Sequence, residues 1–320
     1  MHCANRLSDN DLIDHPVTNP PSRRRPADAS APSGSPRRWR HRLRCRPALL
    51  ALLMSIQCCL PLSAQTPAAE PQTTTLTAHG PGGLWLLRPD GADSITQIGN
   101  SDPDLRRIPA SSFKPLLALI ALQTGALRSA DELVPWDGRA YPRQPHWQRA
   151  MTLEEAMATS SESYFRTLAE RVGSADLQTW LTRVGYGNAQ IGSDVRTAWL
   201  DGVLRISARE QLEFAERLSR GELPFEEHHL SAVRRAMRDQ SADLDWSGKT
   251  GTYLPSGDCS DRQHGDSHCG LGWWIGWTNG PEGSASFVLL VELDRFDGRE
   301  ARLQTARTLL QQAGLVTASD

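Results

Sequence analysis

Segments that favour β-strands stand at both ends of the patterned part of the chain, with helical patterns between them. Residues 84–88 and 94–99 flank an Asp-Gly turn and are predicted as strands. Residues 271–277 and 286–293 are rich in Trp, Val, Ile and Leu and have the same character. Strands from both ends can bury an apolar face only by pairing with one another. The pattern therefore predicts an α+β fold: an antiparallel sheet from both termini flanked by helices, plus a mostly helical lobe.

Helix-start and helix-stop signals divide the middle of the chain. Capping boxes with Glu three residues on predict helices that begin after Thr152 and Ser207. Gly185 and Gly221 stand where these helical patterns end, as C-terminal caps do. A last helix is predicted near 299–313.

The first 64 residues have the pattern of an export signal. A basic run over 36–46 precedes an apolar stretch over about 48–62, and small residues lead to Ala64. The stretch is short for a membrane span, which needs about 20 apolar residues. We expect cleavage near Ala64 and a periplasmic or secreted protein that is not membrane-bound afterwards; a retained anchor is the alternative.

The remaining chain divides into a Pro/Thr-rich linker over 65–80 and one predicted domain over 81–318. Four of the six cysteines fall in the leader, which leaves Cys259 and Cys269. In an oxidising compartment this pair predicts a disulfide. Because His264 and His268 lie between them, a zinc site is the alternative. A net charge of −2 provides no basic field for nucleic acid, so no such partner is expected.

Lysine is almost absent: 33 of the 35 basic residues are Arg, and the two lysines are Lys114 and Lys249. A buried Lys amine can lose its proton, whereas Arg cannot. Ser111-x-x-Lys114 stands at the start of an apolar run that reads as a buried helix. One helical turn would bring the Ser111 hydroxyl to the Lys114 amine. A proton-poor amine, or a carbamate formed on it by carbon dioxide, would then activate Ser111 as a nucleophile.

The second lysine stands in Lys249-Thr250-Gly251, before a segment predicted to be extended. On a sheet edge this tripeptide presents an ammonium, a hydroxyl and a flat backbone to an anionic acyl substrate. A simple turn is the alternative for the tripeptide alone.

The order Ser-x-x-Lys, mid-chain Ser, Lys-Thr-Gly resembles that of penicillin-recognising acyl-serine enzymes. Finer matches resemble class D β-lactamases over about residues 80–316. They are Pro109–Lys114, Ala121–Gly125, Trp136-Asp137-Gly138, Tyr186-Gly187-Asn188, Trp199–Ala208 and Gly272–Trp277. The resemblance implies a β-lactamase/transpeptidase-like fold, a β-lactam substrate, and no metal or organic cofactor.

The resemblance also implies roles for residues of this chain. Ser111 would be acylated, and carbamylated Lys114 (N6-carboxylysine) would act as general base. Trp199 would donate its indole N–H to the carbamate, and Ser160 would pass a proton to the leaving lactam nitrogen. Lys249 and Thr250 would face the substrate carboxylate, and Arg302 stands where the family has its carboxylate-binding Arg. Gly251 and Thr252 would also bind the substrate. The backbone N–H groups of Ser111 and Thr252 would form the oxyanion hole. A solvated helix Arg is the alternative for Arg302.

One position departs from the family pattern. The mid-chain motif is Ser-x-Val or Ser-x-Ile in the family, whereas Ser160-Ser161-Glu162 stands here. A carboxylate beside Lys114 would raise the pKa of that Lys and oppose carbamylation. Glu162 could turn outward, could replace the carbamate as the base, or could cripple deacylation. The last case would leave a penicillin-binding protein or a β-lactam sensor that stays acylated.

Two rival functions use the same serine and lysine. One is a transpeptidase or carboxypeptidase acting on cell-wall peptides, and the other is a non-catalytic β-lactam sensor. The short chain and Tyr186-Gly187-Asn188 favour the β-lactamase over the transpeptidase. We expect a monomer or a homodimer. The pair His228-His229 is expected to lie on a polar helix face, with a ligand pair as the alternative.

Overall fold

A computed structural model describes residues 83–238, 245–254, 270–280, 283–293 and 299–316. All of them belong to one compact unit, Thr66–Asp320. The predicted leader and linker, and the pair Cys259 and Cys269, lie outside the described residues.

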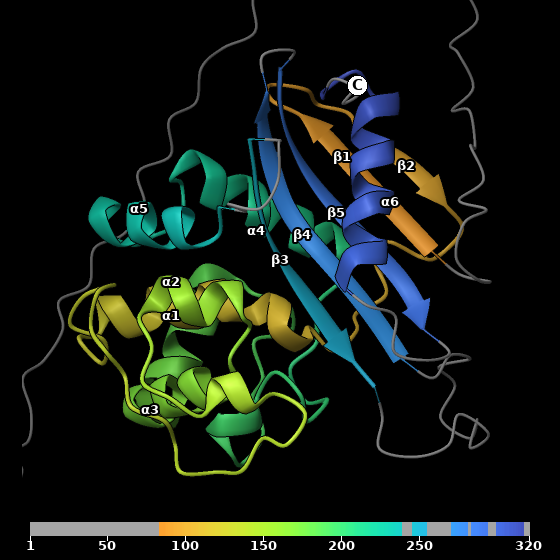
Figure 1. The fold of residues 1–320 in the computed structure, drawn as a ribbon. Helices are drawn as coiled ribbons and strands as arrows, with labels where there is room; N and C mark the ends of the chain where they lie inside the picture. Colours follow the sequence, from red (N-terminus) through yellow and green to blue (C-terminus); the bar gives the residue numbers. More distant parts are fainter. Residues whose placement is uncertain (1–82, 239–244, 255–269, 281–282, 294–298, 317–320) are drawn as a thin grey trace, which may run out of the picture. The chain divides into compact units, whose positions relative to one another are not determined.

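A five-stranded antiparallel sheet joins the two ends of this unit (Figure 1). The strand order is β2-β1-β5-β4-β3. The strands are β1 (Gly83–Pro89), β2 (Thr96–Gly99), β3 (Trp246–Tyr253), β4 (Gly270–Gly280) and β5 (Gly283–Leu293). Strand β1 pairs with β5 along its whole length, from Gly83 opposite Val291 to Pro89 opposite Ala285. This pairing confirms the predicted sheet built from both termini.

Side chains alternate along the strands, so the apolar strands present apolar side chains on both faces of the sheet. Each face is therefore covered. On one face Trp274 and Phe287 pack with the apolar residues of α6 (Arg299–Gln312), which lies across the sheet in Figure 1. On the other face Trp273 and Ile275 join the core of the helical part of the molecule. Helix α4 (Ala208–Arg220) packs against β4 and β5 on this second side. Strand β3 is last in the strand order, so it forms one edge of the sheet.

The helical lobe is built around α1 (Lys114–Gln123), whose residues 114–122 are all buried. Helices α2 (Leu153–Ala158), α3 (Glu162–Val184) and α5 (Glu227–Ala236) contact it. A helix that is apolar all round must be enclosed on every side, as the sequence predicted. Short 3-10 turns complete the lobe: η1 (Ala110–Phe113), η2 (Pro145–Trp147) and η3 (Val195–Thr197).

The predicted helix ends are confirmed. Thr152 and Ser207 each form a complete capping box, at the start of α2 and α4. Gly185 and Gly221 have φ values of 73° and 74°, in the left-handed region that favours glycine at a helix end. Helix α3 also contains a kink at Gly173, where φ is 75°.

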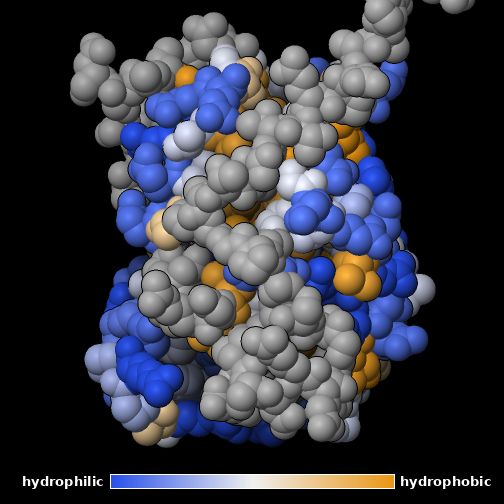
Figure 2. Space-filling view, turned by 90° about the vertical axis from the view of Figure 1, so that its right-hand side faces the viewer, coloured by the Kyte–Doolittle hydropathy of each residue, from blue (hydrophilic) through white to orange (hydrophobic). Residues whose placement is uncertain are grey.

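The described residues on the face drawn in Figure 2 are mainly hydrophilic, and apolar ones show only in separate patches. Among the described residues, no helix has the length and apolarity to cross a membrane.

Candidate active site

Ser111 lies in η1, a tight turn that directly precedes α1. The sequence analysis placed Ser111 and Lys114 one helical turn apart; the structure has a 3-10 turn there, and the α-helix begins at Lys114. Pro115 in the first turn sets that boundary, since proline has no N–H to donate and fits the start of a helix. Ala110 has a φ of 49°, so the backbone just before Ser111 is held in a left-handed conformation that alanine seldom adopts.

A buried hydrogen-bond network holds this turn in place. The Ser112 hydroxyl donates to Pro109 O at 2.7 Å and accepts from Gln211 Nε2 at 2.6 Å. The Tyr186 hydroxyl reaches Gln211 Oε1 at 3.4 Å. The Tyr-Gly-Asn motif therefore supports the nucleophile turn through Gln211 on α4. The sequence analysis did not find Gln211, and its only signal was a polar residue on the apolar side of a helix.

The Lys114 side chain is fully buried and bonds to Ser160. Its Nζ lies 2.6 Å from Ser160 O and 3.1 Å from Ser160 Oγ. The ring centres of Phe165 and Trp147 lie 5.3 and 6.0 Å from the same Nζ. Burial lowers the pKa of Lys114 to about 7; the charge of Glu162 opposes this change and that of Arg166 adds to it. The amine can therefore be proton-poor near neutral pH.

Ser160 brings the two lysines together. Lys249 Nζ lies 3.0 Å from Ser160 Oγ, the oxygen that Lys114 also contacts. Ser160 stands between α2 and α3 with a φ of 53°, and this strained backbone aims the hydroxyl at both amines. Lys249 is buried and lies on β3 with its side chain on the helical-lobe side of the sheet, opposite Ile275.

Strand β3 passes very close to the nucleophile turn. A Cβ atom added at Gly251 would lie 2.9 Å from both Pro109 O and Ser112 N, and 3.2 Å from Ser111 N. Glycine is therefore required at this position for steric reasons. The close approach brings the backbone around Thr252 next to the Ser111 turn, where the oxyanion hole was predicted.

Arg302 reaches the same strand from α6. Its Nη1 donates to Gly251 O and its Nη2 to Thr252 Oγ1, both at 2.7 Å. The side chain passes at Gly272, where an added Cβ would lie 3.0 Å from Arg302 Cδ. Only 2% of Arg302 is exposed, so the alternative of a solvated helix Arg is wrong. Thr250 and Thr252 alternate with Lys249 and lie on the α6 side of this edge strand.

Trp199 packs beside η1, the turn that carries Ser111. Its ring stacks on Phe113 with centroids 6.2 Å apart, and its carbonyl accepts from Ala110 N at 3.0 Å. The residue is fully buried, and its indole Nε1 has no hydrogen-bond partner among the described residues. A buried donor without a partner costs free energy, about 1–3 kcal/mol. Trp199 therefore offers a buried donor that no described residue uses, beside the turn that carries Ser111.

Comparisons with known proteins agree on one family. Residues 91–311 match the model of the penicillin-binding protein transpeptidase domain. The chain is 35% identical over 236 residues to a Bacillus subtilis protein described as "Probable beta-lactamase YbxI", covering 73% of this chain and 82% of that protein. It is 29% identical to β-lactamase OXA-5 of Pseudomonas aeruginosa, with 73% and 85% covered. The chain belongs to the class D β-lactamase family.

Solved structures of class D β-lactamases have the same fold. FUS-1 (OXA-85) from Fusobacterium nucleatum superposes with a TM-score of 0.64 at 27% identity, covering 73% of this chain and 93% of that one. The Bacillus subtilis class D enzyme gives 0.63 at 31% identity, with 74% and 93% covered. The predicted β-lactamase/transpeptidase-like architecture is confirmed.

Glu162 stands where the sequence analysis expected a departure from the class D pattern, and the structure shows where its carboxylate lies. It is the first residue of α3 and forms an ion pair with Arg166 one turn later, with Oε2 and Nη2 3.3 Å apart. Its side chain is 29% exposed. The carboxylate is neither bonded to Lys114, whose hydrogen bonds go to Ser160, nor fully turned to solvent.

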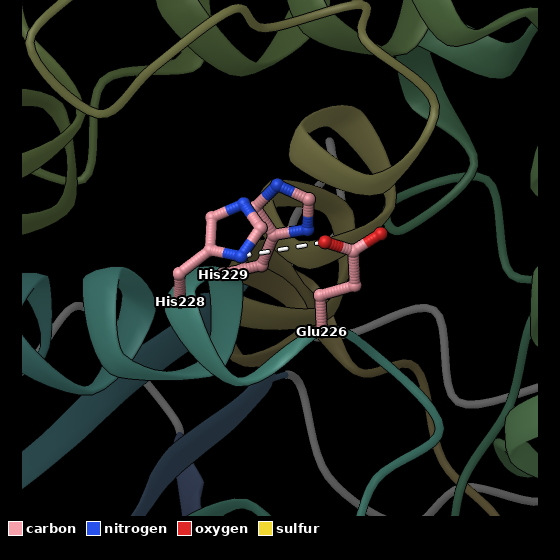
Figure 3. A group of neighbouring side chains, drawn as sticks. All are labelled: Glu226, His228 and His229. Atoms are coloured by element: carbon pink, nitrogen blue, oxygen red, sulfur yellow. Dashed lines mark ion pairs between the residues drawn. The ribbon is translucent and has the colours of Figure 1, made fainter.

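A second cluster of polar groups lies at the start of α5, on side chains that project from the lobe (Figure 3). Ligand atoms of Glu226, His228 and His229 lie within 4.8 Å of one another, and His228 pairs with Glu226. Gln123 Oε1 accepts from Glu226 N and lies 3.2 Å from His229 Nδ1. Gln123 ends α1, whereas Lys114 begins it, so this cluster is separate from the candidate active site.

Proposed function

We propose that this protein is an exported serine β-lactamase that opens the lactam ring of penicillin-type antibiotics through an acyl-enzyme on Ser111. The meeting of both lysines at one hydroxyl, beside the nucleophile turn, carries the proposal. Ser160 is 46 residues from Lys114 and 89 residues from Lys249 in the sequence, yet both amines contact its one hydroxyl oxygen. Nucleophile, base and proton donor are the groups that acyl transfer requires.

Acylation forms a bond between Ser111 Oγ and the lactam carbonyl carbon, and breaks the bond from that carbon to the ring nitrogen. The hydroxyl proton passes to the base at Lys114. Ser160 Oγ gives a proton to the leaving nitrogen, and its hydrogen bonds from Lys114 and Lys249 lower the cost of the negative charge that develops on it. Deacylation adds water to the ester carbonyl and releases Ser111.

We propose that the base is a carbamate on Lys114. Carbon dioxide adds to the neutral amine, a nitrogen–carbon bond forms, and one proton is lost. The group would supply a carboxylate base in an apolar pocket. Two observations fit it: the lowered pKa of Lys114 and the buried Trp199 Nε1, which has no partner among the described residues. No metal or organic cofactor is needed for this chemistry.

The substrate carboxylate is proposed to lie along β3. Lys249, Thr250 and Arg302 surround Gly251 there, and Arg302 already holds the backbone of this strand. Two buried cations at one edge suit an anionic substrate.

The second candidate function is a penicillin-binding protein or sensor that is acylated and deacylates slowly. Glu162 favours it, since the family has an apolar residue there. A relative described as a regulatory protein supports it too: BlaR1 of Bacillus licheniformis is 26% identical, and the match spans 77% of this chain and 39% of that protein.

One assay separates the two candidates. Purified protein is mixed with a chromogenic β-lactam, with and without bicarbonate, and turnover is followed beyond one equivalent. A hydrolase gives many turnovers and a rate that rises with bicarbonate. A burst of one equivalent and a stable acyl-enzyme would instead assign a penicillin-binding protein or sensor. If the rate ignores bicarbonate and Glu162→Gln abolishes it, Glu162 is the base.

Export is proposed from the leader, with cleavage near Ala64 and a Cys259–Cys269 disulfide formed afterwards. Amino-terminal sequencing of protein from the periplasm or medium tests the cleavage. Mass spectrometry without reduction tests the disulfide against the zinc alternative, and light scattering tests monomer against homodimer.

A further inference from the structure

The first turn of α3 places a carboxylate next to the base of this site. Ser160, which bonds to Lys114, comes two residues before Glu162, and Phe165 from the same turn lies against the Lys114 amine. An unpaired carboxylate here would attract the Lys114 ammonium. The site therefore needs something that neutralises Glu162 while leaving the amine proton-poor.

Arg166 meets this need by geometry. It follows Glu162 by four residues, so the two side chains lie on one face of α3, and they form an ion pair. The Arg166 side chain is only 14% exposed, and its Nε has no hydrogen-bond partner among the described residues. Burying a guanidinium in this way is costly unless a charge nearby requires it.

We propose that Arg166 is a positioning residue, which holds Glu162 in an ion pair at the start of α3 and so keeps this carboxylate from pairing with Lys114. This inference rests on the proposed role of Lys114 as the base. It gives a reason why a class D site can carry a carboxylate where the family has Val or Ile.

The electrostatics agree with this geometry. Glu162 raises the pKa of Lys114 and Arg166 lowers it, so the two charges oppose each other at the amine. Lys249 faces Lys114 from β3, across Ser160. From the neighbouring segments, Arg196 lowers the pKa of Asp194, and the charge of Arg166 adds to this shift. Burial and Asp137 raise the pKa of Tyr141, and the charge of Arg166 opposes that shift.

The test compares three variants by the pH dependence of Ser111 acylation with a fluorescent penicillin. This reaction needs a proton-poor Lys114 but no turnover. The acid limb is the part of the pH–rate profile where the acylation rate falls as Lys114 becomes protonated. In Arg166→Gln this limb should move up by at least one pH unit, because Glu162 loses its partner and can pair with the Lys114 ammonium. In Glu162→Val it should move down, because only the cation remains. The double variant should lie close to the native protein. Arg171→Gln is the matched control. Arg171 lies farther along α3 and pairs with Glu132, so the acid limb of this variant should not move.

A second readout is ¹³C NMR in ¹³C-bicarbonate, in which Arg166→Gln should need about tenfold more bicarbonate for the same carbamate signal. Arg166→Lys keeps the charge and should restore the native limb if folding tolerates the change. Unchanged limbs in both Arg166→Gln and Glu162→Val would overturn the inference. A native protein that is acylated but never turns over would overturn the proposed hydrolase instead, and the limb shifts would still decide the role of Arg166.

Discussion

Lys114 and Lys249 contact the same oxygen atom: their Nζ atoms lie 3.1 and 3.0 Å from Ser160 Oγ. Both lysines are buried, so two cations share a hydroxyl in a pocket with little water. Such a pair repels unless one amine is neutral. Burial lowers the pKa of Lys114 to about 7, so this amine can give up its proton near neutral pH.

Replacing Ser160 tests the shared hydroxyl. Ser160→Ala removes the proton donor for the leaving nitrogen, so acylation should slow by about 100-fold or more while the fold is kept. Ser161→Ala is the matched control, because Ser161 caps α3 by accepting from Tyr164 N. Its loss should cost about 1 kcal/mol of stability without changing the acylation rate. Stopped-flow acylation and thermal unfolding measure both quantities; equal rate losses in both variants would contradict the assigned roles.

The pKa of Lys114 predicts the acid limb of the reaction. Because burial depresses this pKa to about 7, the amine is neutral above that pH and protonated below it. Acylation should therefore fall about tenfold for each pH unit below the limb. Rates measured from pH 5 to 9 in buffers freed of bicarbonate check this, because bicarbonate would trap the neutral amine as a carbamate and move the limb below the pKa of the amine. A flat profile down to pH 5 would show that Lys114 is not the base.

Gly251 should tolerate no side chain. In Gly251→Ala the new Cβ would lie 2.9 Å from Pro109 O and Ser112 N, so β3 must move away from the nucleophile turn. We expect acylation to fall by about 100-fold, as misplacement of reacting groups does. Gly91→Ala is the control: Gly91 has a φ of 74° and open space around it, so that change should cost about 1 kcal/mol of stability and leave the rate alone. Native acylation in Gly251→Ala would argue against the close approach.

Arg302 should recognise the substrate carboxylate. Arg302→Gln removes a buried cation, so kcat/KM for penicillins should fall by about 10- to 100-fold, chiefly through KM. The control is a substrate: the methyl ester of the same penicillin lacks the carboxylate. If Arg302 binds the carboxylate, the Arg302→Gln change should lower kcat/KM far less for the ester than for the acid. Equal losses for acid and ester would mean that Arg302 only braces Gly251 and Thr252.

Local and repetitive features of this protein follow from the sequence alone. The capping boxes at Thr152 and Ser207, the left-handed Gly185 and Gly221, and the enclosed helix α1 all depend on residues within a few turns of one another. Short-range hydrogen bonds and side-chain periodicity determine such features. The scarcity of lysine also pointed to both amines of the site.

Contacts between distant segments were decided by the tertiary structure. The partner of Lys114 is Ser160, 46 residues away, and the brace of the nucleophile turn is Gln211, 99 residues from Ser112. The sequence left the place of Glu162 open among three possibilities. Its ion pair with Arg166 is local to α3, but where this pair lies relative to Lys114 depends on the packing of α3 against α1. The pKa of Lys114 depends on its burial by segments that are distant in the sequence, so it is not a property of the local chain.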